Sequence, residues 1–229
     1  MFRARVAPRG TYVSDIFAEV DEDLRAERAK KLLQKYGVLL IAAAVLVVAC
    51  VGAWQAFRSY EKQETARVAE IFLTAMRGAE TAGAAERDQA LAGLDQVARE
   101  GGAGYRALAR LRAAALRFDK GDRDAALALW DQVSADTGAD PLLRDLAALQ
   151  FVWHQIDTGD AAMLATRLAK LTAPGNAWRP LAEEAQALLD LREGRKDAAR
   201  DILKRLSQDI TAPDGVRGRA GGLLSRLGG

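Results

Sequence analysis

The feature that most constrains this chain is an uncharged run between Lys35 and Arg58, YGVLLIAAAVLVVACVGAWQAF. As an α-helix rising about 1.5 Å per residue, a run of this length extends about 33 Å, and the hydrocarbon core of a bilayer is about 30 Å thick. Trp54 stands near one end of the run, where an amphipathic ring suits the membrane interface. We therefore predict a transmembrane helix over residues 36–57.

This helix divides the chain into a tail over residues 1–35 and a body over residues 58–229. Its orientation follows from positive charge, because Lys and Arg are enriched in the loops that stay in the cytoplasm. We predict a cytoplasmic tail and, in a bacterial cell, a periplasmic body anchored in the inner membrane. The tail has slightly more basic residues close to the span than the body has: Arg25, Arg28, Lys30, Lys31 and Lys35 against Arg58, Lys62, Arg67 and Arg77.

The one cysteine of the chain, Cys50, lies inside the apolar run. The sequence Val47-Val48-Ala49-Cys50 is similar to a lipoprotein cleavage box, but the tail before it is longer and more acidic than the basic segment of a signal peptide. We interpret Cys50 as a small residue buried in the membrane, with lipidation as the alternative. A single cysteine leaves the body without an internal disulfide.

The composition after residue 60 favours an all-α body. Ala, Leu, Arg, Asp and Glu dominate there, β-branched residues are scarce, and Gly and Pro punctuate the sequence. The formal net charge of the whole chain is only +2, and Lys and Arg are interleaved with acidic residues. This pattern does not indicate a nucleic-acid-binding protein.

Three similar turns indicate helical repeats. Phe118-Asp-Lys-Gly121, Ile156-Asp-Thr-Gly159 and Leu191-Arg-Glu-Gly194 each place a large apolar residue three positions before Gly, and the glycines are 38 and 35 positions apart. Apolar residues also recur thirteen and six positions before each Gly, and five, nine and twelve positions after it, so each set falls on one helical stripe. Two amphipathic helices per unit at this period are the tetratricopeptide repeat (TPR) pattern.

We name the two sets by the helix that carries them. The first-helix stripe comprises Leu108, Ala115 and Phe118; Leu146, Trp153 and Ile156; and Leu181, Leu188 and Leu191. The second-helix stripe comprises Ala126, Trp130 and Val133; Leu164, Leu168 and Leu171; and Ala199, Leu203 and Leu206.

Further helices are predicted on both sides of these repeats. Residues 61–76 and 86–99 form a helical pair, and the first helix continues out of the membrane span because neither Pro nor Gly interrupts residues 54–76. A short last helix over residues 216–227 caps the stack. The expected architecture is all-α, a transmembrane helix followed by a TPR-like solenoid of helical hairpins. Each second helix is predicted to stop before a proline: Pro141, Pro174 and Pro213.

The sequence shows no catalytic or metal-binding constellation. His154, the single histidine, has no cysteine partners for a zinc site, and no Ser or Cys nucleophile has a second base. Gly218, Gly221 and Gly222 lack the Lys and the Ser or Thr of a phosphate-binding loop. We therefore predict a noncatalytic protein that needs neither cofactor nor metal.

A protein-binding surface is the remaining functional hypothesis. Stacked hairpins present a concave face lined mainly by first helices. Trp153 either faces this groove or belongs to the core, since it shares a stripe with Leu146 and Ile156. His154 likewise either faces the groove or is packed inside the fold. The charged candidates either line the groove or face water. Partner contacts are predicted through Trp153, His154, Asp157, Arg110, Arg117 and Arg192.

The N-terminal tail carries a family-like sequence. It reads SDIFAEVDE over residues 14–22 and ERAKKL over residues 27–32, followed by Tyr36-Gly37 and the single span. Together with the order of the parts, this resembles the tetratricopeptide repeat-like proteins of the ancillary SecYEG translocon subunit family. The similarity is sharpest over residues 14–60. Residues 1–12 precede it, which leaves Val13 as an alternative start to Met1.

The resemblance implies an inner-membrane protein with a periplasmic TPR-like domain. Its expected partners are the Sec translocon, a membrane-anchored periplasmic folding factor and secreted clients. The leading hypothesis is thus a noncatalytic protein that assists protein translocation or periplasmic folding near the translocon. An envelope scaffold, or an adaptor for cell division or envelope assembly, is the second hypothesis. A regulator whose charged tail contacts cytoplasmic proteins is the third.

Overall fold

The structure, a computed structural model, describes residues 14–80 and 83–228. Over these residues it contains nine helices and no strand, which confirms the predicted all-α class. Contacts divide the chain into two compact units, Met1–Lys62 and Gln63–Gly229.

Helix α1 (Ser14–Glu80) contains the whole apolar run. Its path from Trp54 to Met76 is unbroken, as the absence of Pro and Gly predicts. Among the described residues, one helical stretch, Gln34–Glu80, is long and apolar enough to cross a membrane. Its apolar side chains are exposed, with Val38 at 81% and Val48 at 71%. Exposure of so many large apolar side chains is compatible with a lipid environment.

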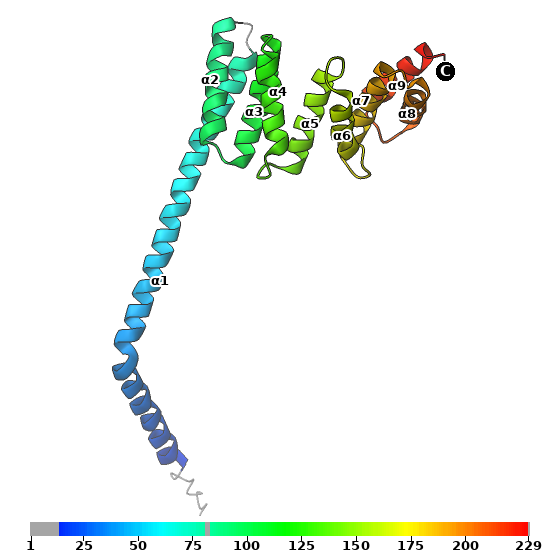
Figure 1. Cartoon of the computed structure of the whole chain (residues 1–229). Helices are drawn as coiled ribbons and strands as arrows, with labels where there is room; N and C mark the ends of the chain where they lie inside the picture. Colours follow the sequence, from blue (N-terminus) through cyan, green and yellow to red (C-terminus); the bar gives the residue numbers. More distant parts are fainter. Residues whose placement is uncertain (1–13, 81–82, 229) are drawn as a thin grey trace, which may run out of the picture. The chain divides into compact units, whose positions relative to one another are not determined.

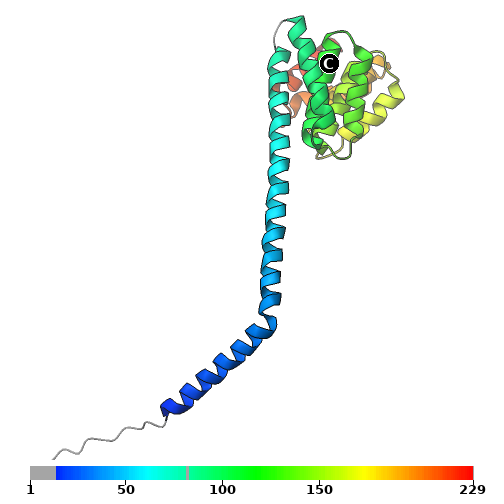
Figure 2. The same cartoon turned by 90° about the vertical axis from the view of Figure 1, so that its left-hand side faces the viewer.

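The second unit is a series of antiparallel helices that follow one another in chain order (Figure 1). Consecutive helices pack together, and α3 also contacts α5, α5 contacts α7, and α7 contacts α9. After a quarter turn the helical pairs overlap in the view, as stacked units do (Figure 2). This is the predicted TPR-like arrangement. The helices after α1 are α2 (Ala84–Glu100), α3 (Ala103–Asp119), α4 (Arg123–Ala135), α5 (Pro141–Gln155), α6 (Ala161–Leu171), α7 (Arg179–Arg192), α8 (Lys196–Gln208) and α9 (Asp214–Arg226).

The second-helix stripe is fully part of the buried core of this unit. All nine of its residues, on α4, α6 and α8, are at most 2% exposed. Full burial of a large apolar side chain stabilises a fold by about 1.5–3 kcal/mol, so this stripe supplies much of the driving force. The first helices contribute small residues to the same core. Ala109, Ala147 and Ala182, each twelve residues before a turn glycine, are fully buried and let the helices approach closely.

Two of the three repeat turns need glycine for its backbone conformation. Gly121 and Gly194 have φ values of +86° and +76°, which side chains with a Cβ rarely adopt. Gly159 does not share this conformation. A Cβ on Gly159 would lie 2.9 Å from the carbonyl oxygen of Gln155, so close backbone approach requires glycine there instead. Glycine is thus required at this repeat position for two different reasons, a positive φ in the outer repeats and close backbone approach in the middle one.

Each second helix stops before its proline, as predicted, but two of these prolines start the next helix instead of ending the preceding one. Helix α4 ends at Ala135, well before Pro141, and Pro141 is instead the first residue of α5. Pro213 caps the start of α9 rather than ending α8. The fixed φ of proline and its missing N–H suit the first turn of a helix. Only Pro174 follows closely on the end of a second helix, α6, as predicted.

Candidate functional site

A cavity of about 400 Å³ opens between α5, α7 and α9, and we call it the first-helix cavity. Three members of the first-helix stripe line it, and none of the nine residues of that stripe is buried. Leu146 and Leu181 occupy equivalent positions in successive repeats, so the cavity follows the repeat. Its full lining is Leu146, Leu149, Gln150, Trp153, Trp178, Leu181 and Arg219.

Two tryptophans form the most specific part of this lining. Both Trp153 and Trp178 pack against the main apolar core while remaining partly exposed. The indole N–H of Trp178 donates to the Leu142 carbonyl at 3.0 Å, and its backbone N–H donates to Asn176 Oδ1 at 2.9 Å. The sequence left open whether Trp153 belongs to the core or to the groove. In the structure it does both, because it packs on the core and lines the cavity. Trp178 was missed because it lies in an irregular loop outside the repeat pattern.

His154 is packed away from this cavity. Its ring stacks on Trp130 with a centroid distance of 4.6 Å and lies 4.0 Å from the Phe118 ring. Burial lowers the pKa of His154, and the nearby Arg123 guanidinium lowers it further, against an opposing effect of Asp119. Arg123 also donates to the backbone carbonyl of His154. The neutral imidazole therefore serves as part of the packing between α3, α4 and α5.

The three candidate arginines contact neighbouring parts of the solenoid. Arg110 lies 3.6 Å from an Asp136 carboxylate oxygen, and Arg117 donates to Asp95 at 2.7 Å. Arg192 donates to the carbonyl oxygens of Ile156 and Gly159 at 2.7 and 2.9 Å. The bonds of Arg117 and Arg192 join successive units, whereas the ion pair of Arg110 lies within one repeat. None of the three arginines lines the first-helix cavity.

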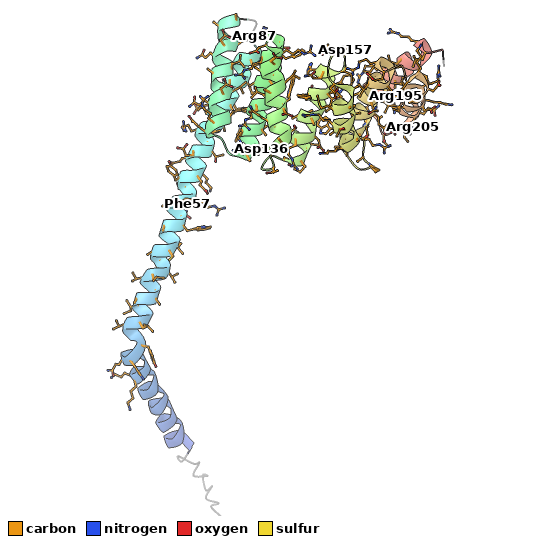
Figure 3. The ribbon with its side chains drawn as sticks, in the orientation of Figure 1. Phe57, Arg87, Asp136, Asp157, Arg195 and Arg205 are labelled. Atoms are coloured by element: carbon orange, nitrogen blue, oxygen red, sulfur yellow. The ribbon has the colours of Figure 1, made fainter. Side chains whose placement is uncertain are left out.

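Asp157 is exposed at the turn that follows α5. Figure 3 shows it at the opposite end of the helices from Asp136. It does not line the first-helix cavity either. Of the six predicted partner residues, the structure therefore places Trp153 alone in this cavity. Partner binding through the other five stays a prediction.

A pair of opposite charges recurs at the loop ends of the outer repeats. Arg106 and Asp136 lie fifteen residues before and after their turn glycine and form a 3.1 Å hydrogen bond. The Gly138 backbone N–H, and then Arg106, hold the pKa of Asp136 below its usual value. Arg179 and Asp209 hold the same positions in the last repeat. Hydrogen bonds from Thr211, with a smaller contribution from Arg179, lower the pKa of Asp209.

The middle repeat breaks this pattern. Its arginine, Arg144, is retained, but Pro174 stands where the other repeats have aspartate. Proline offers no carboxylate, and the Arg144 Nε is buried without a hydrogen-bond partner in the part of the chain that the structure describes. The loop is held differently, since Asn176 donates to Asp145 at 2.8 Å.

An ion pair fixes α9 beside the cavity. Arg219 donates through Nε and Nη2 to the two carboxylate oxygens of Glu184, at 2.6 and 2.7 Å. Glu184 is 2% exposed and occupies the repeat position where α3 and α5 have Leu111 and Leu149. The hydrogen bond to Glu184 raises the pKa of Arg219 despite partial desolvation. This pair was missed, and the break in the apolar repeat at Glu184 was the signal that could have revealed it.

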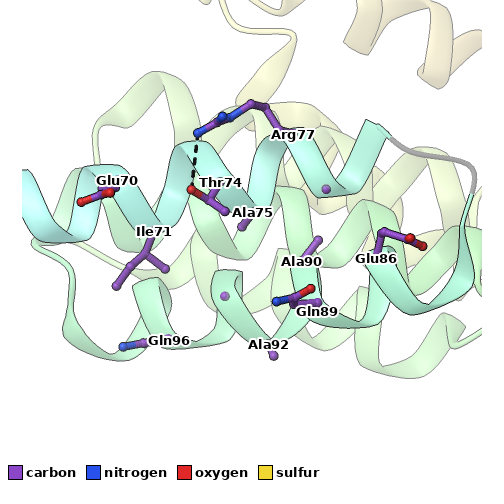
Figure 4. Close-up of a pocket in the computed structure, with 12 residues that line it drawn as sticks. Glu70, Ile71, Thr74, Ala75, Arg77, Glu86, Gln89, Ala90, Ala92 and Gln96 are labelled. Atoms are coloured by element: carbon purple, nitrogen blue, oxygen red, sulfur yellow. Dashed lines mark hydrogen bonds between the residues drawn. The ribbon is translucent and has the colours of Figure 1, made fainter.

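A second pocket, of about 700 Å³, lies on the α1–α2 pair within the second unit. Figure 4 shows Ile71 and Ala75 of α1 facing Ala90 of α2, with the other helices behind this pair. A Cβ on Gly93 would lie only 3.1 Å from the Ala75 Cβ, so the two helices approach closely. Polar residues including Arg77, which donates to Thr74 at 3.5 Å, surround this apolar floor.

Comparison with known families settles the class of the chain. Residues 30–212 match the tetratricopeptide repeat-like domain family. The chain belongs to this family. The matched range includes the apolar run as well as the repeats. Neither the curated proteins nor the solved structures gave a match.

TPR-like domains are typically noncatalytic modules that bind proteins, so protein–protein interaction is the function class of this chain. No group of three or more metal-ligating side chains is found among residues 14–80 and 83–228. The family match does not extend to the finer assignment, the ancillary SecYEG translocon subunit family.

Proposed function

We propose that this TPR-like protein is a membrane-anchored, noncatalytic binding protein that assists protein translocation or periplasmic folding near the Sec translocon. Its apolar run over residues 36–57 spans the inner membrane, its tail over residues 1–35 is cytoplasmic, and its repeats over residues 58–229 face the periplasm. Its partners are the translocon, a periplasmic folding factor and secreted clients.

The observation that carries this proposal is the open first-helix stripe. A solenoid that needed this stripe only for stability would bury it, as it buries the second-helix stripe. Instead Leu146, Trp153 and Leu181 remain accessible around a cavity large enough for apolar side chains. The Trp153 indole N–H, which forms no hydrogen bond within the described residues, can donate to a bound backbone carbonyl.

The family match and the tail support the location. The match includes the apolar run, so the anchor and the repeats belong to one family unit. The tail segments over residues 14–22 and 27–32 resemble those of translocon-associated proteins. A tether raises the effective concentration of the binding surface where secreted chains emerge, without any need for high intrinsic affinity.

Site-specific photocrosslinking in native membranes tests the proposed partners. A photoreactive residue at Gln150, which lines the cavity, is expected to capture translocon components or secreted chains. The control position is Arg205, an exposed residue of α8 labelled in Figure 3. Equal capture from both positions, or no translocon component and no secreted chain from Gln150, would contradict the proposal. Capture of one fixed envelope protein would instead support a scaffold.

Cysteine accessibility tests the proposed orientation. Single cysteines replace Ser14 or Ser225 in a Cys50→Ala background. An impermeant reagent added to spheroplasts is expected to label the position at Ser225 and leave the position at Ser14 protected. The reverse pattern would place the repeats in the cytoplasm and exclude a role at the periplasmic exit of the translocon.

A further inference from the structure

Arg112, on α3, has a guanidinium without a partner among residues 14–80 and 83–228. Its Nε is buried and donates no hydrogen bond, and its side chain forms no ion pair with any described residue. The neighbouring Arg106 and Arg117 each donate to a carboxylate, on Asp136 and Asp95. A donor that loses water without gaining an acceptor is unfavourable, and a cation more so. Arg112 is therefore suited to an acceptor that the described part of the chain does not supply.

The register of the repeats places Arg112 one unit away from a residue that lines the first-helix cavity. It lies nine residues before Gly121, and the equivalent residue before Gly159 is Gln150, which lines the cavity. Arg112 also follows Leu108 by four residues, so the two share one helix face, and Leu108 is 39% exposed. Because α3 packs on α5, Arg112 lies one unit along the row of first helices from Gln150, next to but outside the residues that line the cavity.

Two other arginines show why Arg112 is distinctive. Arg219 lines the cavity as well, but Glu184 already accepts both of its hydrogen bonds. Arg144, like Arg112, has a buried Nε without a partner. It lies at the loop end of its repeat, however, in the position of Arg106 and Arg179, rather than in the register of Gln150. Arg144 is thus a matched control for Arg112: it has the same charge and a buried, unpaired Nε, but it lies at a different position in the repeat.

We propose that the polypeptide segment bound in the first-helix cavity carries an acidic side chain that pairs with Arg112. This inference rests on the proposed function and adds a chemical class to its ligand. Apolar side chains enter the cavity between Trp153 and Trp178, and a carboxylate accepts charge-assisted hydrogen bonds from the guanidinium. Packed helices lie about 8–10 Å apart, a distance that an extended chain covers in about three residues. The ligand is an apolar segment with Asp or Glu about three residues from its anchor.

Peptide selection tests this chemistry without a known ligand. The probe is a phage-displayed library of random dodecapeptides, selected against the full chain in detergent micelles. The unmodified protein is expected to select an apolar core with a nearby acid. Arg112→Gln is expected to keep the apolar core and lose the acid, whereas Arg144→Gln selects the same peptides as the unmodified protein. Trp153→Ala is expected to lose the apolar core.

The affinity of one selected peptide gives the magnitude. Replacing its acid with the corresponding amide is expected to weaken binding about tenfold. The same replacement should leave binding to Arg112→Gln unchanged. A consensus without an acid, or equal loss of acid preference in Arg144→Gln, would overturn the role of Arg112 and leave the cavity function intact. Absence of any consensus that depends on Trp153 would overturn the proposed function as well.

Discussion

The first-helix and second-helix stripes have the same helical periodicity but different environments. The residues of the second-helix stripe are at most 2% exposed, whereas no residue of the first-helix stripe is buried. Each second helix packs between helices of its own unit and the next, while first helices form a row of contacts from α3 to α9. The comparison shows that apolar periodicity defines which residues share a face, and that neighbouring units decide whether the face is covered.

The largest expected effect separates the two stripes by their contribution to stability. Leu168→Ala removes a fully buried side chain and is expected to lower the free energy of unfolding by about 3 kcal/mol. Leu188→Ala, a matched leucine on the first-helix stripe, is partly exposed and should cost about 1 kcal/mol. Denaturant unfolding of both variants, followed by circular dichroism, measures the difference. Equal losses would show that the stripes do not differ in burial.

A smaller effect is expected where a first helix does bury a polar group. Arg219→Ala leaves the Glu184 carboxylate buried without its partner and should lower the free energy of unfolding by about 2 kcal/mol. Glu184→Leu in the same background supplies the residue type of Leu111 and Leu149. It should restore most of the loss in the same denaturation experiment. A double variant no more stable than Arg219→Ala would contradict this account of the pair.

The smallest expected effect concerns the pH dependence of stability. Burial lowers the pKa of His154 in the folded chain, so the unfolded chain binds the proton more readily. The contribution of neutral His154 is complete above the unfolded pKa of about 6.5 and is lost as the pH falls below it. His154→Phe keeps a ring beside Trp130 and should remove this part of the pH dependence. The free energy of unfolding is measured at several pH values between 7 and 5 for both proteins. The same change with pH in the unmodified protein and in His154→Phe would contradict the prediction.

The helices and their pairing could be predicted because they depend on local sequence. Turn glycines such as Gly121, together with apolar spacing of three and four residues, define two helices per unit whatever surrounds them. The distinction between Gly121 and Gly159 could not be predicted, since both are preceded by the same kind of sequence. Gly121 has a φ of +86°, whereas Gly159 is not among the glycines with positive φ.

The cavity was only partly predictable, because its lining depends on contacts between residues that are distant in the sequence. Trp153 belongs to a repeated stripe and was identified, whereas Trp178 lies outside the stripe and is held by hydrogen bonds to Asn176 in its own loop and to Leu142 of α5. The arginine partners depend on residues about twenty to forty positions away, such as Asp95 for Arg117. Arg219 and Glu184 meet because α9 packs on α7. Sequence spacing identifies charges, but only the packing of distant helices shows which charges are paired.

The central claim, that the open first-helix stripe binds protein segments, is tested most directly by placing a charge within it. Leu181→Asp introduces a carboxylate into the apolar cavity lining. Ile210→Asp is the control, because Ile210 is 88% exposed and does not line the cavity. Crosslinking from Gln150 is measured in native membranes for both variants, with folding monitored by circular dichroism. We predict that Leu181→Asp abolishes capture of translocon components and secreted chains while Ile210→Asp preserves it. Undiminished capture by a folded Leu181→Asp variant would contradict the claim.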